Sequence, residues 1–303
     1  MRVTLTGATG LIGTTLLAGL RAEGAQITVL SRDPERAAAA LGVPAERWDP
    51  LGEPAPAAAL EGRDAVVHLA GEPVAQRWSA DAKRAIRESR VIGTRHLVEG
   101  IGACASERPK ALVSASAIGY YGPHGEEPLD EEAPPGSGFL AEVCSAWEAQ
   151  ARGAQELGVR TVQLRTGVVL DPRGGALAKM LPPFRLGVGG PVAGGRQYVS
   201  WIHVGDLVGI MRAALDDERW SGPVNGTAPE PVTNRKLSHA LGRALHRPAL
   251  LPVPGAALRA LYGEMAQIVT TGARVLPAKP LMLGYEFRHP HVQEALSSAL
   301  SDG

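Results

Sequence analysis

Cysteine is scarce in this chain: Cys104 and Cys144 are the only two among 303 residues. They form no CxxC pair and no cluster with metal-ligand spacing, so neither a disulfide framework nor a structural zinc site is expected. The nearest approach to a metal cluster is the sequence HPH at 289–291, and we expect no metal ion there.

An excess of charge of either sign is also missing, since Lys plus Arg and Asp plus Glu both number 31. No overall electrostatic field therefore favours nucleic acid or an anionic membrane as a partner. No run of roughly 18 apolar residues is present, and the opening MRVTLTGATG turns Gly-rich where a signal peptide would stay apolar. We expect a cytoplasmic protein whose partner is a small-molecule substrate, with a homodimer as an open possibility.

Short apolar runs alternate with helical patterns through the first half of the chain. Strands are predicted at RVTLTG, AQITVLS, DAVVHLAG, KALVSASA and VRTVQLRTGVVL, and helices near residues 11–23, 34–41, 79–105 and 139–157. The strand segments are almost continuously apolar, as strands covered on both faces are. This alternation predicts an α/β fold with a Rossmann-type doubly wound parallel sheet.

The composition changes after Leu170, where the chain becomes rich in Gly and Pro. We therefore predict a dinucleotide-binding domain over 1–172 and a smaller C-terminal α/β lobe over 173–303 that binds the substrate. The sequence GPVNGTA near 222–228 predicts a strand that returns to the first domain.

A phosphate-binding loop is indicated at the N-terminus. Gly7, Gly10 and Gly13 follow a strand and precede a helix, which is the setting in which glycines allow a tight turn, close approach of a pyrophosphate and close helix packing. Backbone N–H groups at the start of the helix would complete the site. The predicted contacts are Gly7, Thr9, Gly10, Leu11, Ile12 and Gly13.

The end of the second strand indicates which dinucleotide binds. A carboxylate that holds an unphosphorylated ribose is expected there, but the strand ends in Ser31 and Arg32. A guanidinium suits the 2′-phosphate of NADP(H). Asp33 argues against this choice and Arg36 argues for it, while an Arg32 that only flanks the strand is the alternative.

Two further segments are predicted to line the cofactor. Asp49 in WDP is expected either to accept from the adenine amino group or to be an ordinary turn residue before Pro50. The sequence HLAGEP closes the predicted strand DAVVHLAG with small residues that let backbone approach the phosphates and the nicotinamide ribose. Its predicted contacts are Leu69, Ala70, Gly71 and Glu72.

Five motifs, in order, carry a family resemblance: TGATGLIG, VVHLAG, VSASAIGYYG, LRTGVVL and WIHVGDLV. With them the chain resembles the extended short-chain dehydrogenase/reductases, which include nucleotide-sugar epimerases and dehydratases. SWIHVGDL and the segment from LYGEMAQ to HPHVQEAL resemble the branch called nucleoside-diphosphate-sugar epimerase of SulA type. That resemblance covers essentially the whole chain and implies an epimerase-associated C-terminal domain.

The resemblance also implies a Ser that binds the substrate oxygen, a Tyr that donates or removes its proton, and a Lys, four residues after the Tyr, that lowers the Tyr pKa. Ser116 matches the Ser, but counting back from Glu148 places Leu140 at the Tyr position and Cys144 at the Lys position. The Asn of the preceding helix is replaced by Arg90, so three of the four positions differ. Cys144 is expected to be a small packing residue rather than an acid or nucleophile.

Other groups near the strand ends are candidates for what remains of the site. Tyr120 and Tyr121 are expected either to take part in proton transfer, with Arg90 or Arg165 as a charged neighbour, or simply to line and pack the pocket. Cofactor contacts are also predicted for Ser114, Arg165 and Thr166.

The substrate pocket is predicted from the resemblance and from the segment GGRQYVSWIHVGDLV. Its candidate residues are Arg77, Trp78, Arg90, Arg185, Trp201 and His203. Trp201 is expected to stack on a planar substrate and His203 to hydrogen-bond it, or else both fix the lobe to the sheet while Asp206 caps the next helix.

Two functions are consistent with these observations. The first is an NADP(H)-dependent oxidoreductase or epimerase, atypical in lacking the Tyr and Lys, that acts on a small carbonyl, hydroxyl or nucleotide-linked compound. The second is an NADP(H)-binding regulatory or scaffold protein without turnover.

Overall fold

A seven-stranded parallel sheet forms the centre of the computed structural model, which describes residues 1–301. Its strands are β1 (Arg2–Thr6), β2 (Gln26–Ser31), β3 (Ala45–Arg47), β4 (Ala65–His68), β5 (Ala111–Ala117), β7 (Arg160–Thr166) and β11 (Gly222–Gly226), in the order β11-β7-β5-β4-β1-β2-β3. The order reverses direction between β1 and β4, and ligands of such sheets bind in the crevice outside the strand ends at that point. The predicted α/β doubly wound fold is confirmed.

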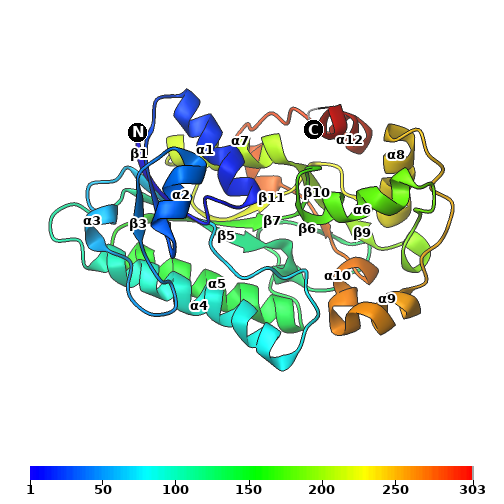
Figure 1. Ribbon diagram of the computed structural model, residues 1–303, viewed down its shortest axis with the longest axis horizontal. Helices are drawn as coiled ribbons and strands as arrows, with labels where there is room; N and C mark the ends of the chain where they lie inside the picture. Colours follow the sequence, from blue (N-terminus) through cyan, green and yellow to red (C-terminus); the bar gives the residue numbers. More distant parts are fainter. Residues whose placement is uncertain (302–303) are drawn as a thin grey trace.

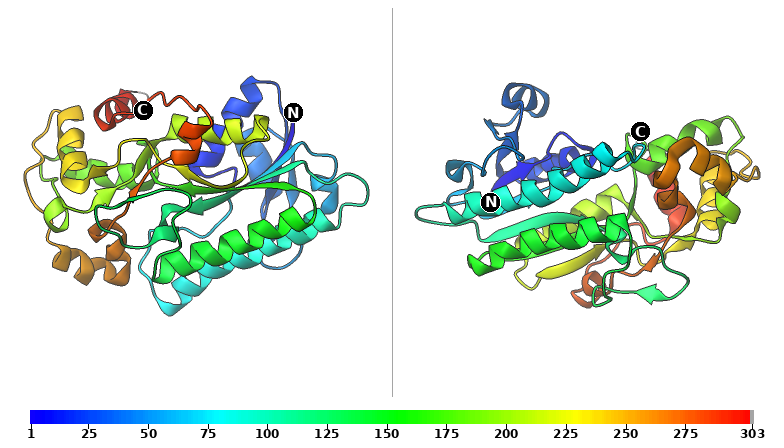
Figure 2. Two further views of the ribbon diagram at one scale, coloured as in Figure 1. Left: turned by 180° about the vertical axis from the view of Figure 1, so that it is seen from behind. Right: turned by 90° about the horizontal axis from the view of Figure 1, so that it is seen from below.

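Helices cover both faces of the sheet (Figure 1). On one face lie the long helices α4 (Ala80–Gly102) and α5 (Phe139–Glu156), which run side by side in the view from below in Figure 2. On the other face lie α1 (Leu11–Ala22), α2 (Pro34–Leu41) and α7 (Val204–Asp216). The short helix α3 (Ala57–Leu60) precedes β4.

Local sequence explains these elements. All four residues of β4 are buried, in keeping with its apolar run. Helix α4 begins after Ser79, whose hydroxyl accepts a hydrogen bond from the Ala82 N–H at 3.1 Å. Close packing of α4 needs Gly100, because a Cβ there would lie 2.3 Å from the Ala55 carbonyl oxygen.

The segment predicted as one long strand from Val159 breaks at Gly167, where a Cβ would lie 2.6 Å from the Ser200 carbonyl oxygen. The chain leaves the sheet there as β8 (Val168–Leu170), which pairs in parallel with β10 (Trp201–His203). Strand β3 has no clear signal in the sequence, because its three residues at the sheet edge are not fully buried.

A smaller lobe with its own apolar core lies beyond the carboxyl end of β7 (Figures 1 and 2). Its elements are α6 (Gly175–Arg185), β9 (Tyr198–Val199), β12 (Val232–Thr233), α8 (Asn234–Ala244), α9 (Gly255–Tyr262), α10 (Gln267–Thr270) and α12 (Val292–Ser301), while β6 (Pro128–Leu129) pairs with β13 (Arg274–Val275). Helix α11 (Ala278–Met282) contacts β11 at the edge of the central sheet instead.

Chain segments after residue 172 contribute to both parts of the molecule. The predicted returning strand is β11, which pairs with β7 at the sheet edge, and α7 packs on the sheet beside α1. The boundary at 172 stays a prediction. Among the described helices, none combines the length and the apolar character that a membrane span requires.

Candidate functional site

The loop between β1 and α1 closes against the end of β4. Gly7 has a φ of 68°, and a Cβ on it would lie 2.6 Å from the Leu69 carbonyl carbon. A Cβ on Gly13 would lie 2.5 Å from the Gly7 carbonyl oxygen. Gly10 differs, because its Cβ would meet only the Gly7 oxygen, at 3.4 Å. Two glycines are therefore needed for the fold of the loop, and Gly10 leaves an open backbone surface.

The start of α1 offers hydrogen-bond donors at this surface. No side chain caps the helix at Gly10, and its first turn contains no acidic residue. The Thr14 N–H bonds back to the Gly10 carbonyl at 2.9 Å, so the N–H groups of Leu11, Ile12 and Gly13 have no partner within the helix. Exposed Thr9 flanks this turn. Free donors at the positive end of a helix suit a diphosphate.

The carboxylate that follows β2 most closely in the sequence, that of Asp33, serves as a helix cap. The Asp33 carboxylate accepts from the Arg36 N–H at 3.1 Å and caps α2. Ser31 exchanges hydrogen bonds with the Asp33 backbone, each at 3.1 Å. The exposed side chains of Arg32 and Arg36 are thus the cationic groups available to a ligand here, with exposed Glu35 between them in the sequence. This donor set fits a 2′-phosphate better than a ribose diol.

Asp49 makes a turn beyond β3. Its carboxylate accepts from the Leu51 N–H at 3.2 Å, and a Cβ on Gly52 would lie 3.0 Å from the carboxylate. The turn role is therefore present, while an adenine contact by this exposed residue stays a prediction.

A buried histidine that the sequence analysis missed supports the segment 69–72. His68 lies between the hydroxyls of Thr6, at 2.7 Å, and Thr94, at 3.0 Å, and so links β1, β4 and α4. Burial, with a smaller effect of Arg90, lowers the pKa of His68 to about 4, so the ring is neutral at pH 7. The Ala70 N–H also bonds to the Thr6 hydroxyl at 3.3 Å.

Ser116 and Ser114, at the end of β5, are both buried. The Ser116 hydroxyl donates to the Glu148 carboxylate at 2.7 Å, so its hydrogen is already used within the protein. The Ser114 hydroxyl donates to the Ala115 carbonyl at 3.3 Å. Helix α5 thus brings Glu148 against Ser116, and binding of a substrate oxygen by Ser116 stays a prediction.

Arg165 has a structural role in place of the predicted cofactor contact. Its Nε and Nη2 donate to the two oxygens of Glu148 at 2.9 and 3.0 Å, and its Nη1 donates to the Tyr121 hydroxyl at 2.9 Å. Burial alone would lower the pKa of Arg165, but the hydrogen bonds to Glu148 outweigh it and raise that pKa. Next to it on β7, the Thr166 hydroxyl donates to the Leu164 carbonyl at 3.4 Å.

The two tyrosines after β5 are not equivalent. Tyr121 is 1% exposed, and its hydroxyl bonds to the Asn225 amide oxygen at 2.7 Å. Burial, partly offset by Arg165, raises the pKa of Tyr121 to about 12, so it cannot exchange protons near pH 7. Tyr120 is half-buried, and its ring lies 3.5 Å from the Arg165 guanidinium carbon. The packing alternative therefore holds for Tyr121.

Leu140 and Cys144 lie against the end of β5. A Cβ on Gly119 would be 3.2 Å from the Leu140 Cβ and 3.7 Å from the Cys144 sulfur. Burial, followed by the negative charge of Glu148, raises the pKa of the Cys144 thiol to about 12. The thiol is therefore protonated at neutral pH and acts neither as a base nor as a nucleophile.

Trp201 and His203 fix the lobe to the sheet. Trp201 is 0% exposed, so the predicted stacking on a substrate is wrong, and its indole N–H donates to the Glu230 carbonyl at 3.0 Å. His203 is buried, and its Nδ1 accepts from the Gly205 N–H at 3.1 Å, which caps α7. The helix cap is thus His203 and not Asp206.

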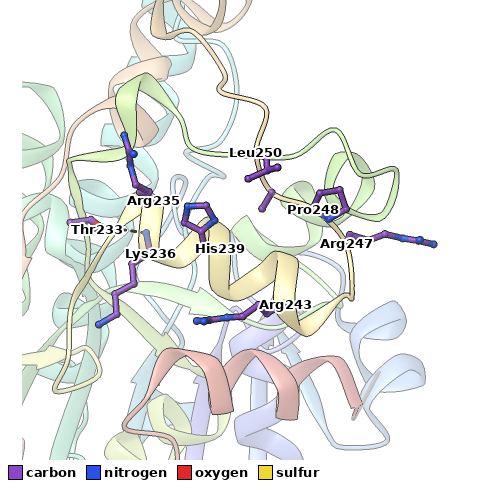
Figure 3. Close-up of a pocket in the computed structure, with 9 residues that line it drawn as sticks. Thr233, Arg235, Lys236, His239, Arg243, Arg247, Pro248 and Leu250 are labelled. Atoms are coloured by element: carbon purple, nitrogen blue, oxygen red, sulfur yellow. Dashed lines mark hydrogen bonds between the residues drawn. The ribbon is translucent and has the colours of Figure 1, made fainter.

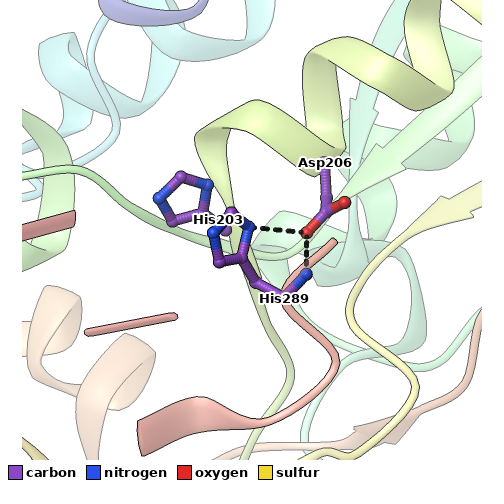
Figure 4. Close-up of side chains that lie close together, drawn as sticks. All are labelled: His203, Asp206 and His289. Atoms are coloured by element: carbon purple, nitrogen blue, oxygen red, sulfur yellow. Dashed lines mark hydrogen bonds and ion pairs between the residues drawn. The ribbon is translucent and has the colours of Figure 1, made fainter. Parts of the chain in front are cut away.

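Figure 4 shows His203, Asp206 and His289 together, with candidate metal-ligand atoms within 4.8 Å of one another. The imidazole rings lie 3.9 Å apart. Asp206 accepts from the backbone N–H groups of Arg288, at 2.8 Å, and His289, at 3.0 Å. The cluster therefore anchors the segment before α12, because its polar atoms already serve protein hydrogen bonds.

The remaining pocket candidates differ in burial. Trp78 is buried edge-on to Phe139, with ring centroids 5.0 Å apart. Arg77 and Arg185 are exposed, the latter in the last turn of α6. Arg90 is partly buried, and its Nη1 donates to the Glu72 carbonyl at 2.9 Å.

A basic groove of about 780 Å³ lies along α8, in the smaller lobe. The sequence analysis did not single it out. Figure 3 shows that its cationic side chains diverge: Arg235 and Arg247 point away from each other. Arg235 donates to the Gly194 carbonyl at 2.9 Å and Arg243 to Gln293 at 2.9 Å. Figure 1 places α8 far from β1, so the groove is separate from the phosphate loop.

Comparisons with known proteins agree with this geometry. Residues 3–225 match the NAD dependent epimerase/dehydratase family, and residues 253–299 match a domain of unknown function, DUF1731. The epimerase family protein SDR39U1 homolog of Arabidopsis thaliana, named chloroplastic, is 43% identical over 304 residues, covering 99% of this chain and 87% of that protein. Human SDR39U1 is 38% identical over 306 residues, covering 99% and 100%.

Solved structures are similar over the whole chain. The crystal structure of human SDR39U1 with NADPH has a TM-score of 0.89 and 36% identity, with 100% of both chains covered. A nucleoside-diphosphate sugar epimerase from Corynebacterium glutamicum has a TM-score of 0.78 and 36% identity, covering 99% of this chain and 58% of that one. A UDP-glucuronic acid 4-epimerase from Bacillus cereus, at 16% identity and a TM-score of 0.78, shares the fold.

Proposed function

From the premise that the chain belongs to the NAD dependent epimerase/dehydratase family, we propose that it binds NADP(H) at the carboxyl edge of the sheet and is an atypical oxidoreductase or epimerase of a small carbonyl, hydroxyl or nucleotide-linked compound. The observation that carries the cofactor choice is the end of β2. There Asp33 caps α2, and Arg32 and Arg36 remain exposed. A relative with 36% identity has been crystallised with NADPH, which supports the same choice.

The chain's own residues perform binding and positioning in this proposal. The α1 N-terminus and Gly10 hold the diphosphate, and Arg32 holds the 2′-phosphate. The cofactor supplies hydride chemistry when it is bound. An apolar wall of Trp78, Phe139 and Leu140 excludes water from the end of β5. Because positioning can contribute more to the rate than general acid-base assistance, turnover without the Tyr and Lys is chemically reasonable.

Replacing Arg32 tests the cofactor choice. Arg32→Ala removes one charge-assisted contact to phosphate, so the affinity for NADPH should fall by about tenfold to a hundredfold while the affinity for NADH changes little. Titration calorimetry with both dinucleotides measures this difference. The control is Arg95→Ala, which removes an exposed arginine of α4. An equal loss for both dinucleotides would remove the assignment of Arg32 to the 2′-phosphate.

Binding without turnover is the second candidate function, because Leu140, the protonated Cys144 and the buried Tyr121 leave the usual proton path without a titratable group. The two functions separate in one experiment. NADPH deuterated stereospecifically at C4 is incubated with the protein and a metabolite extract, and mass spectrometry follows the deuterium. We expect label in one or more metabolites. With saturating cofactor and no transferred label, the scaffold function would replace the enzymatic one.

A further inference from the structure

Arg90 occupies an unusual place between the ends of β4 and β5. Its guanidinium carbon lies 5.1 Å from the centre of the Trp147 ring. On the Gly71 side, a Cβ on that glycine would lie 3.3 Å from the same carbon. The planar group is therefore held between an aromatic ring and the backbone of the loop that follows β4. These two contacts fix the orientation of the Arg90 guanidinium more firmly than the orientation of an exposed arginine is fixed.

The hydrogen bonds of Arg90 leave one edge of the guanidinium unused. Nη1 donates to the carbonyls of Glu72, at 2.9 Å, and Ile86, at 3.1 Å. Within residues 1–301, Nε and Nη2 have no hydrogen-bond partner, and they are not sealed from solvent. The Glu72 carboxylate is engaged elsewhere, because it accepts from Gln76 at 3.1 Å.

The positive charge of Arg90 is also not neutralised. No carboxylate in the described part of the chain forms an ion pair with it. Arg165, the other arginine packed against α5, has both of its matching donors on Glu148. Burial lowers the pKa of Arg90, with partial compensation from Cys144 and Glu72. A partly buried cation that forms no ion pair is costly, and an anionic ligand bound to it reduces that cost.

Arg90 also lies beside the positions that the missing Tyr and Lys would occupy. It packs on Trp147 of α5, the helix that carries Cys144 at the Lys position, and Cys144 lies against Gly119 at the end of β5. The guanidinium also lies against the backbone of Gly71, where a Cβ would be 3.4 Å from both Nη1 and Nη2. An oxyanion bound at this point would belong either to the dinucleotide or to the substrate.

We propose that Arg90 is an oxyanion-binding residue, whose Nε and Nη2 edge holds a carboxylate or phosphate group between the ends of β4 and β5. The inference rests on the proposed function in one respect, namely that the dinucleotide site adjoins Gly71. If the oxyanion is the diphosphate, Arg90 contributes to cofactor affinity. If the substrate carries it, the substrate is an acidic compound, and Arg90 orients that compound for hydride transfer.

Three variants test this role: Arg90→Met, Arg90→Lys and the control Arg87→Met, which removes an exposed arginine from the same helix one turn earlier. Near-UV circular dichroism first establishes folding. Affinities for NADPH and NADH are then measured at several NaCl concentrations. Malonate and inorganic phosphate are titrated into the free protein and its NADPH complex, with the thermal midpoint as readout.

If Arg90 contacts the diphosphate, Arg90→Met should lower the affinities for NADPH and NADH alike by at least about tenfold. These affinities should also depend less on salt concentration than those of the native protein, and Arg90→Lys should give intermediate values. A substrate contact predicts dinucleotide affinity within about twofold of native, together with loss of the malonate or phosphate shift. Arg87→Met should behave as native in both cases. A weakened affinity with an unchanged salt dependence would indicate a purely structural Arg90 and overturn the proposal.

Native dinucleotide and anion binding in Arg90→Met would also overturn it. Should Arg90→Met fail to fold, the native protein decides: anion shifts of the thermal midpoint that Arg90→Lys reduces support the proposal, and their absence together with salt-independent NADPH binding refutes it. Failure of the proposed function has a separate signature. Native protein that binds neither dinucleotide removes the cofactor assignment, while the anion titration of free protein still tests Arg90.

Discussion

Arg165→Met is expected to lower the free energy of unfolding by about 3 to 5 kcal/mol, because it leaves the buried Glu148 carboxylate with only the Ser116 hydroxyl and a long ion pair, at 3.9 Å, to half-exposed Arg152. The side chains of Arg165 and Glu148 are 3% and 1% exposed, and they form two parallel hydrogen bonds. Methionine keeps the length of the arginine stem, so most of the loss is electrostatic. Urea unfolding, followed by circular dichroism, measures the difference.

A matched surface pair provides the control for this prediction. Arg219 donates to Asp217 with comparable geometry, but its side chain is 68% exposed. Arg219→Met should therefore cost less than about 1 kcal/mol. The double variant Arg165→Met with Glu148→Gln should recover part of the lost stability, because the uncompensated charge is removed as well. If Arg165→Met costs no more than Arg219→Met, the buried pair does not stabilise the fold as described.

Gly10→Ala is expected to abolish NADPH binding while the protein stays folded. A Cβ at Gly10 meets only the Gly7 carbonyl oxygen, at 3.4 Å, so the substitution fits the loop. The methyl group would project toward the surface at which the helix N-terminus meets the diphosphate. Losing this close approach should lower the affinity for NADPH by about a hundredfold or more, which corresponds to roughly 3 kcal/mol of binding free energy. Calorimetric titration and thermal unfolding together measure the two properties.

Substitutions of two other glycines, both within α1, serve as controls for Gly10→Ala. Gly13→Ala places a Cβ 2.5 Å from the Gly7 oxygen, so it should lower stability as well as affinity. Gly19→Ala meets nothing closer than Arg212 Cδ at 3.9 Å, so it should leave binding unchanged and stabilise α1 by about 0.5 to 1 kcal/mol. If Gly10→Ala binds NADPH as the Gly19→Ala protein does, the diphosphate does not lie at this loop.

Local sequence patterns were enough to predict the sheet, its helices and the phosphate loop. Apolar runs buried on both faces mark β4 and β5, and a glycine triplet between a strand and a helix has few structural meanings. The same logic failed at Gly167, where the chain leaves the sheet. A close approach to Ser200, a residue distant in the sequence, decides that break.

Some features of the candidate site also follow from the sequence, whereas others depend on the tertiary structure. The sequence by itself showed that the Tyr and Lys positions hold Leu140 and Cys144, and that no carboxylate directly ends β2. Only the tertiary structure showed that Asp33 is used as a helix cap, that Arg165 is neutralised by Glu148, and that Arg90 is not neutralised. Residue type and spacing reveal which groups a chain carries. Which charges are paired depends on helices and strands brought together from distant segments, and burial then sets the free energy of each unpaired charge.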